Sequence, residues 1–215
     1  MSQAKVQAGG YHRESLDNTW RTPENILERV FYFGGPIPFD PATGPENPTR
    51  ALRYCTGDLP APPVAPSLFP APVEQLDAER LALARADGLA TPWDWPTWCN
   101  PPYGGEIKAW LAKFVRESGR GTEIVALLPC SRWETSYLQE ALVRAVALCL
   151  IRKRVAFVSS QDGAQVGGNT TGSMLVGWNV RSVSTFFAAF RPLGACFELG
   201  QAATQERAER DMESA

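Results

Sequence analysis

The chain has 215 residues, of which 44% are hydrophobic, which is enough for one packed domain of ordinary size or two small ones. A formal net charge of −2 excludes a globally basic surface, so any contact with nucleic acid has to come from local clusters of cations. The single histidine, His12, and the lack of a Cys-x-x-Cys pair argue against a metal site. No signal peptide and no apolar run of about 18 residues is visible, so we expect no membrane segment.

Polar residues dominate both ends of the sequence. Residues 1–17 are expected to be a flexible N-terminal tail and residues 201–215 a polar C-terminal tail, on either side of one domain over residues 18–200. Six prolines in residues 57–73 predict an extended loop inserted into that domain. The five cysteines, most of them in apolar surroundings, predict buried thiols in a reducing cytoplasm.

Two turns in the N-terminal part have the features of ligand sites. Thr22-Pro23-Glu24 predicts a helix start, with Thr22 as the cap and Pro23 at the first helical position. Residues 37–42 are typical of a short strand ending in the carboxylate of Asp40, which is where open α/β sheets bind ligands. Taken alone, the same residues also fit an ordinary Asp-Pro turn.

The remaining chain alternates between helix and strand patterns. Apolar spacing predicts helices over residues 73–86, 107–115 and 138–145. Strands are expected at residues 123–129, 147–151, 155–158, 174–178 and 195–199. This alternation predicts an α/β domain with a largely parallel central sheet and helices on both faces. Asp40 and Asn100 would then both follow the carboxyl end of a strand, with their loops opening on the same edge of the sheet.

Asn100-Pro101-Pro102-Tyr103 ends a short apolar run and can hold the amino group of a planar amide or an aminopurine. The side-chain carbonyl of Asn100 and the backbone carbonyl of Pro101 can each accept one N–H bond, which directs the nitrogen lone pair toward a methyl donor. The two prolines hold φ at about −65° and stiffen the loop, while Tyr103 offers a flat face on which a base can stack. A plain proline turn after a strand is the alternative.

Arg152-Lys153-Arg154 is a cluster of adjacent cations between two predicted strands. We expect it to contact DNA phosphates, together with Arg132 and the loop over residues 159–172. A solvated strand edge that discourages sheet pairing explains the same three residues equally well.

Several motifs occur in a fixed order: Trp20-x-Thr22-Pro23, Phe39-Asp40-Pro41-Ala42, Asp87-Gly88-Leu89, Trp98-x-Asn100-Pro101-Pro102-Tyr103 and the strand into Leu128-Pro129. With the later Arg154-Val155-x-Phe157 and Gly172-Ser173-Met174-Leu175-Val176, they resemble the phage-encoded Dam-like DNA N6-adenine methyltransferases over roughly residues 18–180. The resemblance implies a Rossmann-like fold that uses S-adenosylmethionine and methylates a flipped adenine in double-stranded DNA. It also implies a phage or prophage protein in the cytoplasm of a bacterial host, active in DNA methylation or restriction-modification, and it leaves the oligomeric state open.

The resemblance also assigns roles to particular residues. It implies that Asn100, Pro101, Pro102 and Tyr103 form the target-base site. It implies a cofactor pocket that contains Thr22, Pro23, Asp40, Pro41, Ala42 and Asp87, with Asp40 near the methionine ammonium. The turn at residues 42–45 lacks the Gly-x-Gly of many methyltransferases.

Two other functions fit parts of the sequence. A protein glutamine N5-methyltransferase also uses Asn-Pro-Pro-Tyr, because a glutamine amide presents the same NH₂ group as adenine. A methyltransferase-like DNA-binding protein without a cofactor is consistent with the weak glycine signal after Asp40, although the intact tetrapeptide argues against it.

Overall fold

The computed structural model describes residues 20–44, 46–57, 82–131, 133–159, 164–166 and 171–200. Both predicted tails, most of the proline-rich segment, most of the predicted helix at residues 73–86, and Arg132 lie outside these ranges. Among the helices that are described, none is long and apolar enough to cross a membrane.

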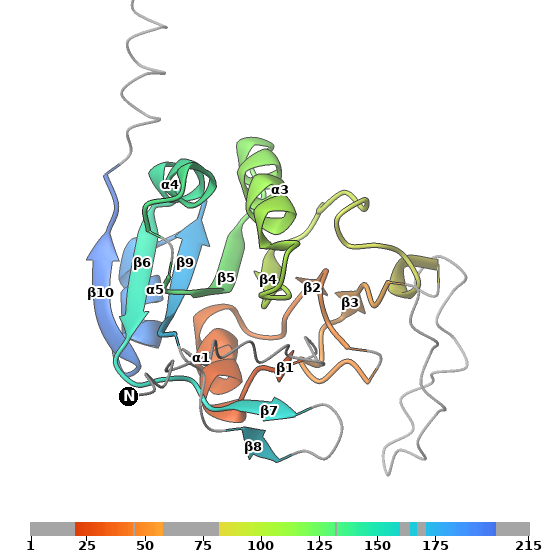
Figure 1. Cartoon of the computed structure of the whole chain (residues 1–215), viewed down its shortest axis with the longest axis horizontal. Helices are drawn as coiled ribbons and strands as arrows, with labels where there is room; N and C mark the ends of the chain where they lie inside the picture. Colours follow the sequence, from red (N-terminus) through yellow and green to blue (C-terminus); the bar gives the residue numbers. More distant parts are fainter. Residues whose placement is uncertain are drawn as a thin grey trace, which may run out of the picture.

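Seven strands of the described chain form the central sheet. They are β2 (Phe39–Asp40), β3 (Arg53–Tyr54), β4 (Thr97–Cys99), β5 (Ile124–Pro129), β6 (Ala147–Ile151), β9 (Ser173–Trp178) and β10 (Gly194–Glu198). Across the sheet their order is β10-β6-β9-β5-β4-β2-β3 (Figure 1). The very short β3 was not predicted from the sequence, whereas the other strands lie at or near expected positions.

The expectation of a largely parallel sheet needs correction. β3, β2, β4 and β5 pair in parallel, but β9 is antiparallel to both β5 and β6, and β10 is antiparallel to β6. Parallel neighbours need a long crossover connection, usually through a helix. The described chain between β6 and β9 instead contains further strands, so β9 enters the sheet in the opposite direction. The protein therefore has an α/β fold whose central sheet is mixed, with both parallel and antiparallel pairs.

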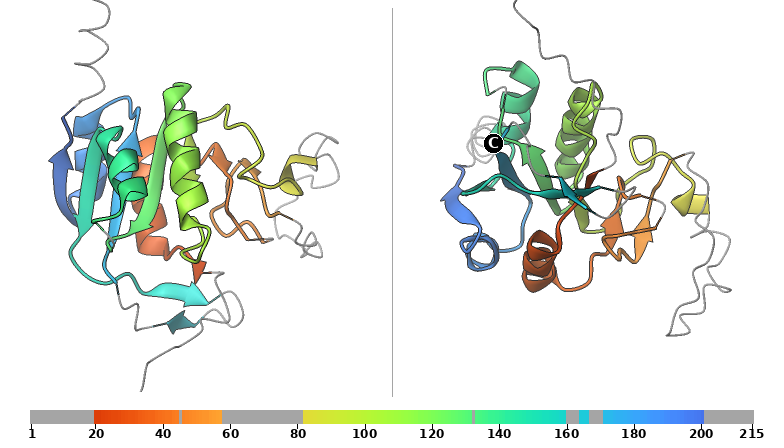
Figure 2. Two further views of the ribbon diagram at one scale, coloured as in Figure 1. Left: turned by 45° about the horizontal axis from the view of Figure 1, so that its top comes forward. Right: turned by 60° about the horizontal axis from the view of Figure 1, so that its bottom comes forward.

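Helices cover both faces of the sheet, as predicted. On one face lie α1 (Glu24–Gly34) and α5 (Val183–Phe190), and on the other lie α3 (Ile107–Gly119) and α4 (Ser136–Val143) (Figure 2). The apolar stripe of α1, formed by Ile26, Leu27 and Val30, packs in one core cluster with Phe186 of α5. A second cluster joins α3 and α4 to the other side of the sheet. The sequence analysis did not identify α5.

A small three-stranded sheet consists of β1 (Trp20–Arg21), β7 (Phe157–Ser159) and β8 (Gln165–Val166), with β7 in the middle. Thr22 directly follows β1, and Pro23, not Thr22, is the N-cap of α1, without a side-chain capping bond. The predicted Thr22 cap is therefore wrong. Pro23 is itself extended, with ψ of 150°, and its carbonyl accepts the first helical bonds, from the Ile26 and Leu27 N–H groups, so the helix begins one residue later than expected and Pro23 does not occupy its first position.

Candidate active site

The candidate site lies where the connections of the central sheet change direction. β2 leads outward to β3, whereas its neighbour β4 leads to β5 on the other side. In open α/β sheets, such a reversal leaves a crevice outside the carboxyl ends of the two strands. Asp40 is the last residue of β2, and Asn100 follows the last residue of β4, so both lie at the carboxyl ends of the two strands between which the connections reverse.

Asp40 is a buried carboxyl group held by its own loop. One carboxylate oxygen accepts a hydrogen bond from the backbone N–H of Ala42 at 3.0 Å, and the other accepts one from the hydroxyl of Thr49 at 2.8 Å. Burial raises the pKa of Asp40 to about 6, because desolvation outweighs these two hydrogen bonds, which favour the charged form. The carboxyl group is therefore held in one orientation, and its pKa lies closer to neutral pH than that of an ordinary aspartate.

Thr22 and Pro23 are buried and are tied to the loop that holds Asp40. On one side of them, Arg21 pairs with Glu46. On the other side, Glu24 pairs with Arg50 at 3.0 Å. Glu46 and Arg50 belong to the segment that carries Thr49, so the N-terminal turn and the Asp40 loop form one connected unit.

The turn at Asp87 lies against the other side of the Asp40 loop. A Cβ atom at Gly88 would come within 1.9 Å of the Pro41 carbonyl oxygen, so only glycine fits there. The indole N–H of Trp93 donates to the Gly88 carbonyl at 2.9 Å. Asp87 itself is exposed, and its carboxylate accepts a bond from the Leu89 N–H at 2.9 Å, which closes the turn.

Helix α3 anchors this turn through a buried charged group. The Lys113 ammonium donates to the Thr91 carbonyl at 2.5 Å and pairs with Glu117, one helical turn away, at 2.8 Å. Both side chains are at most 2% exposed. Burial acts to raise the pKa of Glu117, but the hydrogen bond and charge of Lys113 lower it below its ordinary value. The Glu117 carboxylate is thus favoured in its charged form inside the fold.

The Asn100–Tyr103 loop is partly enclosed. The side-chain oxygen of Asn100 is shielded from solvent, and Pro101 is buried. Tyr103 donates its hydroxyl to the Leu127 carbonyl of β5 at 3.2 Å, and its ring meets Phe157 of β7 edge to face, with centroids 5.7 Å apart. Burial raises the pKa of Tyr103 far above its ordinary value. Tyr103 is thus a neutral, positioned ring rather than a base.

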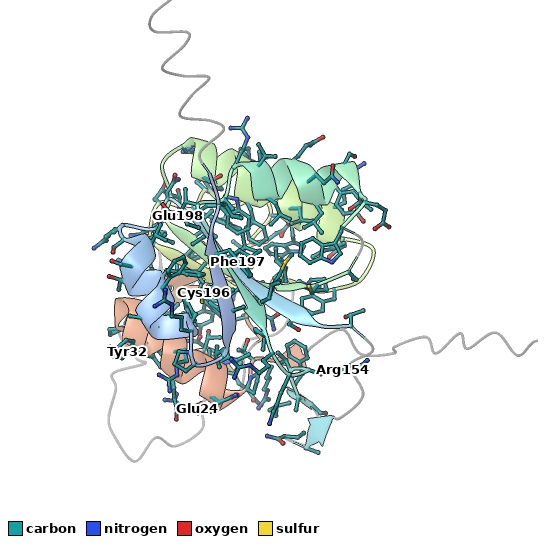
Figure 3. The ribbon with its side chains drawn as sticks, turned by 90° about the vertical axis from the view of Figure 1, so that its left-hand side faces the viewer. Glu24, Tyr32, Arg154, Cys196, Phe197 and Glu198 are labelled. Atoms are coloured by element: carbon teal, nitrogen blue, oxygen red, sulfur yellow. The ribbon has the colours of Figure 1, made fainter. Side chains whose placement is uncertain are left out.

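The basic cluster follows the carboxyl end of β6. β6 runs in the same direction as β4 and β5, because β5 and β6 are both antiparallel to β9. The residues Arg152, Lys153 and Arg154 therefore follow the carboxyl end of β6, on the side of the sheet where Asn100 follows the carboxyl end of β4. All three side chains are exposed. Figure 3 shows Arg154 beside the chain that leads to β7 and β8, far from Glu198 at the other end of the sheet. The position predicted for Arg132 lies outside the described residues.

The sequence analysis did not identify the residues that support this site. Thr49 bonds Asp40 nine positions away, Trp93 bonds Gly88 five positions away and Lys113 bonds Thr91 22 positions away, and no local pattern marks these contacts. Gly88 was part of a recognisable motif, but its packing against Pro41 was not predicted. Among the described residues, no group of three His, Cys, Asp or Glu side chains is arranged to hold a metal ion.

Comparison with known families relates the chain to a family of DNA-modifying enzymes. The family model described as DNA N-6-adenine-methyltransferase (Dam) matches residues 75–193, which is more than half of the chain. The matched segment contains Asp87, Asn100–Tyr103 and Arg152–Arg154, but begins after Asp40. A search of curated proteins finds no match.

Proposed function

Because the chain belongs to the DNA N-6-adenine-methyltransferase (Dam) family, we propose that it methylates the N6 amino group of adenine in double-stranded DNA, with S-adenosylmethionine as the methyl donor. The observation that carries this proposal is the common position of Asn100–Tyr103 and the buried Asp40 at the crevice between β2 and β4. An amino-group acceptor site and a cation site meet there.

The Asn100 and Pro101 carbonyls hold the amino group of the target base. The exocyclic nitrogen of adenine is a poor nucleophile, because its lone pair is delocalised into the ring. Two accepted N–H bonds localise that lone pair and stabilise the positive charge that develops on nitrogen. The base is flipped out of the duplex and packs on the Tyr103 ring, which the Leu127 and Phe157 contacts hold in place. The proton leaves to water after transfer, so no strong base is required.

The residues around Asp40 fit the methionine end of S-adenosylmethionine. When bound, this group supplies a methyl on a positively charged sulfur, which leaves as a neutral thioether. Asp40 is a desolvated carboxyl with one hydrogen bond to each oxygen, so it retains lone pairs for an ammonium group. Thr22, Pro23, Pro41 and Ala42 line the same pocket, with Asp87 at its rim.

Arg152, Lys153 and Arg154 bind DNA phosphates beside the flipped base. Their place at the carboxyl edge supports this role over that of a solvated strand edge, since the base site opens on the same side.

The decisive experiment is transfer of radiolabelled methyl from S-adenosylmethionine to unmethylated duplex DNA, followed by nucleoside analysis. We expect N6-methyladenine. The Asn100→Ala variant should lose turnover and still bind the cofactor, whereas the matched variant Asn25→Ala, at an exposed position of α1, should behave as wild type.

Other outcomes would identify a different function. Label in protein but not in DNA would indicate a glutamine methyltransferase. The lack of any cofactor binding would indicate a DNA-binding protein on this fold. An Asn100→Ala variant with the wild-type rate would refute the assigned acceptor site.

A further inference from the structure

Cys149 of β6 and Cys196 of β10 lie directly opposite each other across two antiparallel strands. β10 is the outermost strand at this end of the central sheet, and Figure 3 views the molecule from that side, with Cys196 labelled midway along the strand. Cys149 is buried in the core cluster that α1 and α5 share, and Cys196 packs against the same cluster. Both thiols are therefore on one face of the sheet.

The backbone hydrogen bonds between β6 and β10 define the geometry of this cysteine pair. The Arg152 N–H donates to the Leu193 carbonyl at 3.0 Å, and at the other end the Leu199 N–H donates to the Val146 carbonyl at 3.0 Å. Bonded and non-bonded pairs alternate along antiparallel strands, and the cysteines stand three positions from each of these bonded pairs, so they form a non-bonded pair. The Cα atoms of such a pair are about 4.5 Å apart, within the range of about 4.4–6.8 Å that disulfides require.

The two thiols interact through a hydrogen bond. This bond raises the pKa of Cys149 and lowers that of Cys196, as expected when Cys149 is the donor. The Cys149 sulfur also lies 3.4 Å from the Phe190 carbonyl oxygen. The charge of Arg191 further lowers the pKa of Cys196, although burial keeps the pKa of both thiols above its ordinary value. Cys196 is therefore the thiol that reacts first with a dissolved reagent, because it is the less buried and the more acidic of the two.

The other three of the five cysteines do not have this geometry. Cys55 follows β3 and Cys99 ends β4, and β2 lies between these two strands, so their backbones are roughly 10 Å apart. A disulfide cannot bridge Cα atoms more than about 7 Å apart without backbone movement. Cys130 follows β5 and has Gly172 opposite it, bonded through its backbone N–H. Cys130 is partly exposed like Cys196, so it provides a matched thiol without a cysteine opposite.

We propose that Cys149 and Cys196 form a redox-active dithiol site, which low-molecular-weight disulfides convert to a disulfide bond between β6 and β10. The Cys196 thiolate attacks one sulfur of the reagent, whose S–S bond breaks and whose other half leaves as a thiol. Cys149 then attacks the Cys196 sulfur and releases the second half. Two protein thiols are thus oxidised, one reagent disulfide is reduced to two thiols, and the two protons from the protein end on those products. β9 and β5 separate β6 from β4, so the site is distinct from the proposed methyl-transfer site.

The test is oxidation of the folded, full-length chain by glutathione disulfide, followed by acid quenching, alkylation of the remaining thiols and tryptic digestion. Trypsin separates the two cysteines, because residues 145–152 and 182–207 form different peptides. We expect these two peptides to be recovered joined by a disulfide and without alkylation at either cysteine. The joined peptides should exceed the mixed disulfide of Cys196 with glutathione roughly tenfold or more, because Cys149 is held next to the reacting sulfur.

Three variants identify the thiols that take part. Cys149→Ser should stop at the mixed disulfide of Cys196 with glutathione, whereas Cys130→Ser should give the joined peptides at the wild-type level. If Cys149→Ser fails to fold, Cys196→Ser, at the partly exposed position, should leave Cys149 fully alkylated. The proposal would be overturned if Cys149 and Cys196 both remained alkylated after prolonged oxidation, whatever the state of Cys130. It would equally be overturned if either cysteine were joined to a different one, or if the joined peptides appeared only after denaturation.

Discussion

Gly88 is packed directly against Pro41, with room for no Cβ atom between them: one at Gly88 would lie 1.9 Å from the Pro41 carbonyl oxygen. This contact joins the Asp87 turn to the loop that follows β2. The two loops come from separate parts of the sequence and meet directly after the carboxyl end of β2. The proposed cofactor pocket therefore depends on the close approach of two backbones.

Replacement of Gly88 by alanine should separate these loops. We expect a loss of about 1–3 kcal/mol in the free energy of unfolding, because the new methyl group overpacks a backbone contact. Affinity for S-adenosylmethionine should fall roughly tenfold or more as Asp40 and Asp87 move apart. Calorimetric titration and denaturant unfolding measure the two effects.

Gly119 provides a matched control for this substitution, because nothing lies within 4 Å of a Cβ at its position near the end of α3. Gly119→Ala should leave cofactor affinity unchanged. Wild-type cofactor affinity in Gly88→Ala would show that the contact with Pro41 does not shape the pocket.

Cofactor binding should depend on pH through Asp40. The pKa of Asp40 is raised from 3.8 to about 6 by burial, so the carboxyl group becomes neutral as pH falls below that value. An ammonium group prefers the carboxylate, and affinity for S-adenosylmethionine should therefore decrease up to about tenfold per pH unit below about pH 6. Asp40→Asn should bind weakly and with little pH dependence, as measured by titration calorimetry between about pH 5 and pH 7.

The same shift has a consequence for stability with a defined sign. Since the folded-state pKa lies above the unfolded value, the folded protein binds the proton more tightly. The contribution of Asp40 to the free energy of unfolding should be largest below about pH 4, decrease as pH rises to about pH 6, and then level off. Asp40→Asn should remove this decrease, and an unchanged pH profile in that variant would contradict the assignment.

The parts of the fold that sequence reasoning identified correctly depend on local patterns. Strands bounded by proline and aspartate predicted that Asp40 and Asn100 follow strand ends, and the two loops lie on one edge of the sheet. The direction of β9 was not predictable in this way, because it depends on which strands it pairs with in three dimensions. Likewise, Lys113 acts on Thr91, which is 22 positions away, and its own sequence neighbourhood looks like an ordinary amphipathic helix.

The Lys113–Glu117 pair should stabilise the folded protein and hold the loop over residues 87–93 in its observed conformation. Lys113→Met leaves the Glu117 carboxylate buried and removes the donor to the Thr91 carbonyl. Loss of one partner of a buried ion pair costs about 3–5 kcal/mol, which denaturant unfolding would detect. The double variant Lys113→Met, Glu117→Gln should be less destabilised than the sum of the single variants, because no uncompensated charge remains.

Arg120 provides the comparison for this network. It lies 3.6 Å from Glu117 but is more than half exposed, so Arg120→Ala should cost less than about 1 kcal/mol. If Lys113→Met were no more destabilising than Arg120→Ala, the buried pair would not be the anchor of the loop.

The basic cluster should determine how salt affects DNA binding. Each cation that neutralises a phosphate contributes about 0.9 to the slope of log affinity against log salt concentration. Replacing Arg152, Lys153 and Arg154 together by glutamine should therefore reduce the slope by up to about 3, with weaker binding to all sequences and unchanged affinity for S-adenosylmethionine. Fluorescence anisotropy on a labelled duplex at several salt concentrations gives the slope.

Arg144 provides the control for this prediction. It is an exposed cation just before β6 begins, on the side of the sheet opposite to Arg152, and Arg144→Gln should leave the slope unchanged. A triple variant with the wild-type slope would show that these cations form a solvated strand edge instead, and that DNA contacts the enzyme elsewhere.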